Sequence, residues 1–295
     1  MKAYEYCKES NIMEAQRGRK DDGRNHTGVK LATMTGKLQS LIIGYQAGKY
    51  FFIRSGSKTV VKDYDSETVQ EVMKETGKKV GDKITFKSLS TSVKLNTYCQ
   101  EHRKCKGSIC EKCFSEAALS GDDSKSAGMR RNLEHNHNRL AWNVLNYADL
   151  PIITTDYFRF ESHGDLNSVF QVLNYLMICE KALANGSKTR FALWTKNPEI
   201  LDKVFNVYHI EKPANLTIQI SSLYVDVECN KGLDRWYADR VFTVLSTPEV
   251  ADNLDVKFNC CSPDRKHTYC IGCRNCYKTV SENGVDRVFE MLREK

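Results

Sequence analysis

Residues 151 to 260 alternate between short β-rich runs and amphipathic helical segments, and this alternation strongly constrains the fold. The β-rich runs are PIITTDYFRF, FALWT, NLTIQISSLYV, RVFTVLS and VKFNC. Segments with helical periodicity lie between them, namely SVFQVLNYLMICEKAL, PEILDKVFNVY and PEVADNL. Strands that alternate with helices pair in parallel through right-handed crossovers. The pattern predicts an α/β fold, either a doubly wound sheet or a complete or partial (β/α) TIM-like barrel. KITFKSL (83–89) is a candidate sixth strand, and the last segment, VDRVFEMLREK, is predicted to be an outer helix.

The N-terminal part of the chain has a different residue pattern. Residues 1–30 are polar and irregular, while 38–64 contains β-rich runs in which SGSK separates YFFIR from TVVKDY as a hairpin turn would. Ser66 is predicted to cap a helix that ends at Gly77. We therefore expect a small α+β appendage over 1–82, followed by a main α/β domain with Cys-rich loops over 83–295. Residues 114–148 are expected to be mostly helical, with a break at SGDDSKSAG.

Cysteine is unusually frequent, with 12 residues in a chain of 295. The N-terminus lacks the apolar core of a secretory signal, and no run approaches the roughly 18 apolar residues of a membrane span. We therefore expect a cytoplasmic protein with no membrane partner. Disulfides do not persist in a reducing cytoplasm, so this cysteine content indicates metal or redox chemistry. Three cysteines are isolated, and of these Cys179 is predicted to belong to the core. They are Cys7, Cys179 and Cys229.

The other cysteines form two groups whose spacing is typical of metal ligands. The first group is Cys99, Cys105, Cys110 and Cys113, and the second is Cys260, Cys261, Cys270, Cys273 and Cys276. The x2 spacing from Cys270 through Cys273 to Cys276 is that of bacterial ferredoxin loops, whereas zinc prefers CxxC pairs set further apart. The second group therefore favours a [4Fe-4S] cluster, with either Cys260 or Cys261 as fourth ligand. The first group fits a second cluster or a zinc ion, or supplies ligands to the same centre, with the roles of Cys99 and Cys105 left open.

Polar side chains follow several of the β-rich runs. Functional groups of (β/α) barrels collect at the carboxyl ends of the strands, so these residues are candidates for a cofactor-binding mouth. The candidates are Glu161, His163, Asp165 and Lys196, and Ser162, Thr195, Ser221, Ser222 and Ser246 occupy similar positions. His135 and His137 are expected to be surface residues of a helix rather than metal ligands.

Four motifs occur in an order that resembles the phage gene product 88-like proteins. They are a cysteine loop ending in CxxCFSEAAL, then RFESHGDL, then FALWTKNPEIL, and a tail reading FNC…CIGCRNCY. In that family the pattern is a CxxxCYA-type loop, an RxHxSGD-type strand end, a YTK strand end and a CxxCxxCW-type tail. The likeness covers about residues 85–280. It implies an iron–sulfur protein of viral or mobile-element origin with a radical-SAM-like barrel, but no particular substrate.

Three functional hypotheses follow. The first is a redox or structural [4Fe-4S] protein whose cluster is held by four cysteines. The second is a radical-SAM-like enzyme, in which Cys105, Cys110 and Cys113 leave one iron for S-adenosylmethionine; the x4 spacing and the lack of a GGE-like segment do not support it. The third is a zinc-stapled nucleic-acid-binding protein, favoured by the net charge of +7 and by aromatic residues beside the cysteines. Those aromatic residues are Tyr98, Phe114, Tyr269 and Tyr277.

Other common chemistries lack a sequence signature. The chain has no GxxxxGK[ST], GxGxxG or HExxH motif, which argues against P-loop, dinucleotide-binding and zincin functions. Whether the protein is an enzyme is left open, and a nucleic acid or a host protein is its candidate partner.

Overall fold

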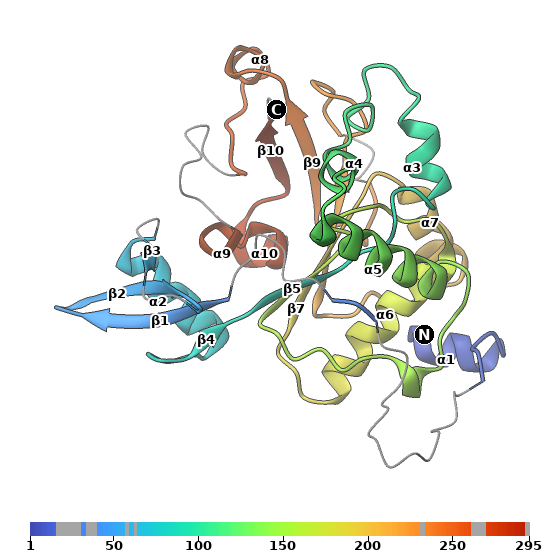
Figure 1. Cartoon of the computed structure of the whole chain (residues 1–295), viewed down its shortest axis with the longest axis horizontal. Helices are drawn as coiled ribbons and strands as arrows, with labels where there is room; N and C mark the ends of the chain where they lie inside the picture. Colours follow the sequence, from blue (N-terminus) through green and yellow to red (C-terminus); the bar gives the residue numbers. More distant parts are fainter. Residues whose placement is uncertain are drawn as a thin grey trace.

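The structure is a computed structural model that describes residues 1–15, 31–33, 40–56, 59–61, 64–229, 234–260 and 270–292. Figure 1 shows a large sheet with helices packed against it and a small, separate sheet that projects to one side. Among the described residues, no helix has the length and apolar content needed to cross a bilayer.

The large sheet has six strands, all parallel, in the order β10-β9-β8-β7-β6-β5. The strands are β5 (Phe86–Leu89), β6 (Tyr157–Phe160), β7 (Arg190–Thr195), β8 (Leu216–Ser221), β9 (Arg240–Leu245) and β10 (Arg287–Met291). The predicted α/β class with parallel strands is confirmed. Because all six strands run in the same direction, every loop that follows a strand emerges at one edge, which we call the carboxyl edge.

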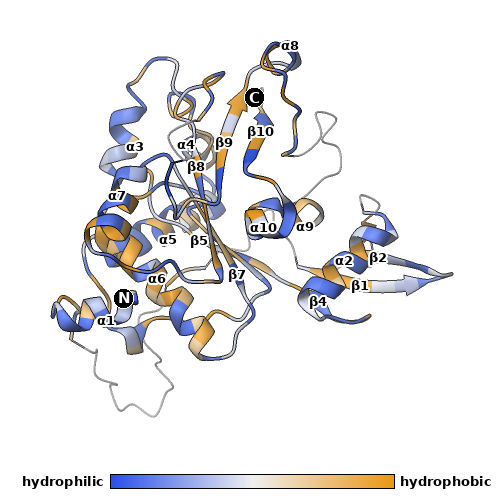
Figure 2. Ribbon diagram, turned by 180° about the vertical axis from the view of Figure 1, so that it is seen from behind, coloured by the Kyte–Doolittle hydropathy of each residue, from blue (hydrophilic) through white to orange (hydrophobic). Residues whose placement is uncertain are grey.

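One face of this sheet is covered by α6 (Val169–Ala184), the predicted helix after β6. The Ser168 side chain caps it by accepting a hydrogen bond from the backbone N–H of Gln171 at 3.2 Å. The helix packs with Phe158, Phe160 and Phe191 of the sheet in the largest apolar cluster. Cys179 lies in this cluster, so its predicted core position is confirmed. Figure 2 shows that apolar residues concentrate in the central strands and α6, whereas α3 in the outer layer is largely hydrophilic.

Further helices belong to the part of the chain that surrounds the large sheet. They are α1 (Ala3–Glu9), α3 (Thr97–His102), α4 (Phe114–Leu119), α5 (Ser124–Leu140), α7 (Pro198–Asp202) and α8 (Pro248–Asn253). The predicted break between two helices in 114–148 is present, because α4 ends before Ser120 and Asp123 caps α5. The segment predicted as one helix after β7 begins as α7 and continues as a π-helical turn, Lys203–Val207.

The small sheet is antiparallel, in the order β3-β2-β1-β4, with α2 (Ser66–Thr76) beside it. Its strands are β1 (Leu41–Gln46), β2 (Lys49–Arg54), β3 (Val60–Val61) and β4 (Lys83–Ile84). The pairing of β2 with β3 agrees with the predicted hairpin. The N-cap of α2 is Asp65, whose carboxylate accepts from Thr68 N–H at 2.7 Å, and Gly77 ends the helix as predicted.

The segment predicted as one strand at 83–89 is divided between the two sheets. β4 pairs with β1 of the small sheet, whereas β5 pairs with β6 of the large one. Thr85 lies between them, and both its backbone N–H and its hydroxyl donate to the Asp156 carboxylate, at 2.8 and 2.9 Å. The chain therefore passes from one sheet to the other at Thr85, a tertiary choice that the apolar pattern of the segment does not encode.

Two predictions near the C-terminus are wrong. VDRVFEMLREK, predicted as a helix, contains strand β10, and VKFNC, predicted as a strand, is irregular. Short apolar runs fit either a helix or a strand, and here Val288 pairs with Phe242 of β9 in the sheet. The segment before it lies along β10, because the Asn259 side chain bonds to Arg287 O and Phe289 N–H, at 2.8 and 2.9 Å.

Candidate metal centre

The C-terminal cysteines lie on the face of the large sheet opposite α6. Cys270, Cys273 and Cys276 belong to a segment, residues 270–277, that forms α9 (Cys270–Cys273) and a 3-10 turn (Asn275–Tyr277) and that we call the cysteine loop. Two β8 side chains hold it, since Thr217 Oγ1 and Gln219 Nε2 both donate to the carbonyl of Cys276, at 2.5 and 3.1 Å.

The conformation of the cysteine loop places Cys270 and Cys273 near Cys276. Arg274 has a left-handed backbone, with φ +50°, and its N–H donates to Cys270 O at 2.8 Å, so the chain turns back after α9. Burial raises the pKa of Cys276, and the nearby Cys273 and Cys270 thiols raise it further. The structure therefore places the three cysteines of the ferredoxin-like spacing in one short loop, and their role as ligands stays a prediction. Cys260 ends the preceding described segment, 234–260, and Cys261 lies outside the described residues.

Two arginines line the sheet beneath this loop. Arg240, at the start of β9, is only 2% exposed and donates through Nη2 to Asn283 Oδ1 at 2.9 Å. Arg159 of β6 lies over the Trp194 ring, 3.9 Å from its centroid. Both cations lower the pKa of Cys276, against the effect of burial. They give the loop the positive surroundings that thiolate ligands need. Sequence reasoning missed both residues, although a charged residue within an apolar β-rich run was a visible signal.

Cys260 contacts an apolar cluster on the same face of the sheet. Its neighbours there are Phe242 and Val244 of β9 and Val288 of β10, and its N–H donates to Phe289 O at 3.1 Å. Cys260 is the last residue of VKFNC, which was predicted to be a strand, but this run is irregular and Cys260 lies beside β10. Along β9, Phe242 and Val244 lie nearer to the carboxyl edge than Arg240. Cys260 thus faces the sheet on the carboxyl side of the cysteine loop.

The first cysteine group is at the carboxyl edge, in the long connection after β5. Cys99 is buried on α3, and its pKa is raised by burial, by Asp165 and by Cys110, and lowered by Lys196. The pKa of Cys110 is raised chiefly by burial and lowered by the same lysine, with Cys113 and Cys105 close enough to raise it. The fold therefore brings the first cysteine group close to two of the predicted mouth residues, Asp165 and Lys196.

The carboxylates predicted for the binding mouth are engaged by the chain itself. Asp165 accepts from Thr195 Oγ1 at 2.5 Å and from the Lys196 N–H at 3.0 Å, and so joins the ends of β6 and β7. Glu161 accepts from Thr91 N–H at 3.2 Å and from the hydroxyl of Tyr175. Its burial raises its pKa to about 8. Both carboxylates thus hold together segments of the chain at the carboxyl edge. A direct contact between either of them and a ligand stays a prediction.

The turn between these carboxylates needs glycine. Gly164 has φ +84°, and a Cβ there would lie 2.8 Å from Glu161 Oε2 and 2.8 Å from Thr91 O. His163, in the same turn, has its Nδ1 3.1 Å from Ser115 Oγ, and burial together with Arg159 lowers its pKa to about 4. The His163 imidazole is therefore neutral at neutral pH, and it lies against the start of α4.

The two cysteine groups have different charged neighbours. Lys196 and Asp165 accompany the first group, while Arg240 and Arg159 accompany Cys276. An apolar cluster joins the two regions, because Ile109 of the first group's connection packs in it with Trp194 and Cys260. In the described part of the chain, no three His, Cys, Asp or Glu side chains stand in a geometry that would hold a single metal ion. The two cysteine groups therefore lie in separate surroundings that this apolar cluster connects.

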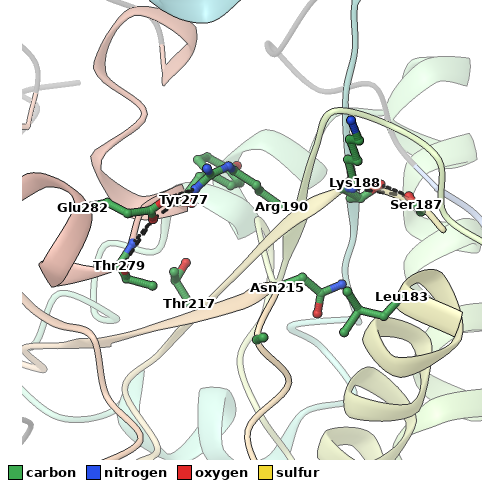
Figure 3. Close-up of a pocket in the computed structure, with 11 residues that line it drawn as sticks. Leu183, Ser187, Lys188, Arg190, Asn215, Thr217, Tyr277, Thr279 and Glu282 are labelled. Atoms are coloured by element: carbon green, nitrogen blue, oxygen red, sulfur yellow. Dashed lines mark hydrogen bonds and ion pairs between the residues drawn. The ribbon is translucent and has the colours of Figure 1, made fainter. Parts of the chain in front are cut away.

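A pocket of about 410 Å³ lies at the amino ends of β7 and β8, the edge opposite to the predicted mouth. Figure 3 shows Arg190, Tyr277 and Glu282 on one side of it and Asn215 on the other. Arg190 Nη1 donates to Glu282 Oε1 at 2.9 Å and to Tyr277 O at 3.2 Å. The pocket therefore adjoins the end of the cysteine loop. No sequence motif indicated it.

One histidine differs from its predicted position. His137 was expected on the surface of a helix, but it is fully buried on α5, where its ring meets Trp142 edge-on at 5.7 Å. Neither ring nitrogen has a hydrogen-bond partner among the described residues. Burial lowers its pKa to about 4. His135 on the same helix is exposed, as predicted.

The buried His137 predicts a pH dependence of stability. Unfolded histidine binds a proton below about pH 6.5, whereas the folded ring stays neutral down to about pH 4. The unfolded state therefore binds more protons in this window, and stability falls as pH decreases through it, by at most about 1.4 kcal/mol per pH unit. Urea unfolding from pH 4 to 7 should show a smaller slope for His137→Leu than for wild type. Equal slopes would contradict the prediction, and His135→Leu is the control for loss of an exposed imidazole.

Comparisons of the chain with protein families, with curated proteins and with solved structures find no match.

Proposed function

We propose that this protein binds a [4Fe-4S] cluster at the cysteine loop, with Cys270, Cys273 and Cys276 as three ligands. The observation that carries the proposal is that Cys276 lies close enough to Cys270, to Cys273 and to two sheet arginines for each of them to shift its pKa. Cys260 is the fourth ligand in this proposal, because it faces the same side of the sheet. A cluster with four thiolates is anionic, so a positively charged wall suits it.

The residues of the chain have separate tasks in this proposal. Thr217 and Gln219 bind the carbonyl of Cys276 and so hold the cysteine loop against β8. Arg240 and Arg159 supply positive charge, and Trp194 and Phe242 provide apolar surroundings. The cluster, when bound, would supply one-electron redox chemistry or a cross-link between the loop and the sheet.

The first cysteine group forms a second metal centre in this proposal, either a cluster or a zinc ion. Cys99, Cys105, Cys110 and Cys113 lie in the connection that follows the first strand of the large sheet. Four thiolates are a closed ligand set for either kind of centre. Lys196 provides the nearby positive charge.

A second candidate function is a radical-SAM-like enzyme. The observation that favours it is the sequential order of the parallel strands, with a cysteine group at the carboxyl edge directly after β5. In this proposal the large sheet is a partial (β/α) barrel, open between β5 and β10. The resemblance to phage gene product 88-like proteins and a host-cell cytoplasmic location belong to the same proposal. Binding of S-adenosylmethionine is the measurement that separates it from a fully ligated cluster.

The test is anaerobic purification followed by iron, sulfide and zinc analysis with a visible spectrum. We expect about four irons and four sulfides per cluster, lost from the cysteine loop in Cys273→Ala and from the first group in Cys110→Ala if that group also holds a cluster. Cys179→Ala, in the core, is the matched control and should keep the full content. A colourless protein with stoichiometric zinc would overturn the iron–sulfur proposal and favour the zinc-stapled nucleic-acid-binding alternative.

A further inference from the structure

Two arginines are almost fully buried, and they are satisfied very differently. Arg274 donates to Glu75 at 3.0 Å, to Glu71 at 2.8 Å and to Ile271 O at 2.8 Å. Arg240 donates only through Nη2, to Asn283, and its Nε and Nη1 have no hydrogen-bond partner among the described residues. The carboxylates nearest to Arg240 are otherwise engaged, because Asp239 binds Lys212 at 2.7 Å and Glu282 binds Arg190 at 2.9 Å.

A buried guanidinium with unsatisfied donors is costly. Transfer of an unpaired charge from water into a protein interior costs several kcal/mol even after relaxation. Evolved interiors keep such a group where another charge or a hydrogen-bond acceptor compensates it. The position of Arg240 therefore indicates an anionic partner on this face of the sheet.

Two residues linked to Arg240 also bond to the cysteine loop. In the sheet, Arg240 is the register partner of Gln219, whose amide donates to Cys276 O at 3.1 Å. Its other contact, Asn283, donates to Asn275 O at 3.4 Å. The strand partner of Arg240 and the residue bonded to its guanidinium thus both bond to the loop that carries the three cysteines. Arg159, across the sheet on β6, has an Nε without a hydrogen-bond partner among the described residues.

We propose that Arg240, assisted by Arg159, is the counter-charge of a redox-active centre at the cysteine loop, which rests on the proposed cluster. A one-electron donor adds one negative charge to the centre, with no bond made or broken and no proton moved. A fixed positive charge in a buried, weakly screened site stabilises the more negative, reduced state more than the oxidised state. Arg240 is therefore a positioning residue for charge, and the centre acts in electron transfer rather than only as a structural cross-link.

The test is a reductive titration of the purified holoprotein with dithionite, followed by visible absorbance. At the potential where wild type is half reduced, Arg240→Met should have a ratio of reduced to oxidised cluster at least about tenfold lower, which is about 59 mV for one electron. Arg240→Lys, which keeps a charge, should fall between the two. Arg235→Met is the matched control, because it removes the same charge from an ion pair with Asp202 elsewhere on the protein.

Iron and sulfide contents of each variant accompany the titration. Arg240→Met with full iron content and the wild-type midpoint would overturn the counter-charge role. Loss of iron from both Arg240→Met and Arg240→Lys would also overturn it, since Arg240 would then be needed for assembly rather than for redox balance. A wild-type protein without iron and sulfide would instead refute the proposed function, so the two failures are distinguishable.

Discussion

Replacing Glu75 with glutamine is expected to lower the free energy of unfolding by about 3 kcal/mol, because it breaks a buried ion pair. The Glu75 carboxylate on α2 accepts from Arg274 Nε at 3.0 Å and from the Tyr157 hydroxyl at 2.9 Å. It also forms ion pairs with Lys278 and Arg190, at 3.3 and 3.5 Å. One carboxylate therefore ties the small sheet's helix to the cysteine loop and to the large sheet.

Glu71→Gln is the matched control for this prediction. Glu71 binds the same guanidinium at 2.8 Å, but its side chain is 59% exposed, so its loss should cost about 1 kcal/mol or less. Chemical denaturation of both variants measures the difference. Equal costs for the two substitutions would show that burial of Glu75 does not strengthen the pair. Because Arg274 lies within the cysteine loop, we also expect Glu75→Gln to lose iron more readily than Glu71→Gln.

Replacing Phe160 with alanine is expected to lower the free energy of unfolding by about 3–5 kcal/mol. The Phe160 ring is fully buried and stacks on Tyr175, with centroids 4.2 Å apart, and on Phe191 at 5.6 Å. Its removal leaves a cavity between β6, β7 and α6 at the centre of the largest apolar cluster. The loss comes from transfer of the ring and from contacts that its neighbours cannot recover.

Phe170→Ala on α6 is the control for loss of a phenyl ring. Phe170 is 36% exposed, so its substitution should cost about 1 kcal/mol or less. Guanidinium denaturation followed by far-ultraviolet circular dichroism measures both variants. A cost below about 2 kcal/mol for Phe160→Ala would mean that the sheet and α6 close over the cavity.

The helices and central strands could be predicted from local sequence because their signals were strong. α6 has an apolar pattern sixteen residues long with a serine cap, and β6 to β9 are β-rich runs separated by helical periods. β10 could not be distinguished from a helix, because its run is short and its pairing with β9 is a long-range choice. KITFKSL was divided between two sheets for the same reason: the partners that fix each half lie elsewhere in the chain.

The candidate centre, too, could be predicted from the sequence only in part. Spacing alone identified Cys270, Cys273 and Cys276 as a predicted ligand set, because two-residue spacers keep the cysteines close along the chain. Sequence also placed Asp165 and Lys196 at strand ends, and parallel pairing then brought them to one edge. The sequence could not show that the Asp165 carboxylate accepts a hydrogen bond from Thr195, because the two residues are 30 positions apart in the chain.

The sequence by itself determined the α/β class, the helix after β6 and the cysteine spacings, since all of these depend on local periodicity and short separations. Only the tertiary structure decided that Arg240, Arg159 and the cysteine loop share one face of the sheet, and that His137 is buried. Those arrangements depend on side chains far apart in the chain, whose burial and charge acquire meaning only when the strands pair and the loop packs against them.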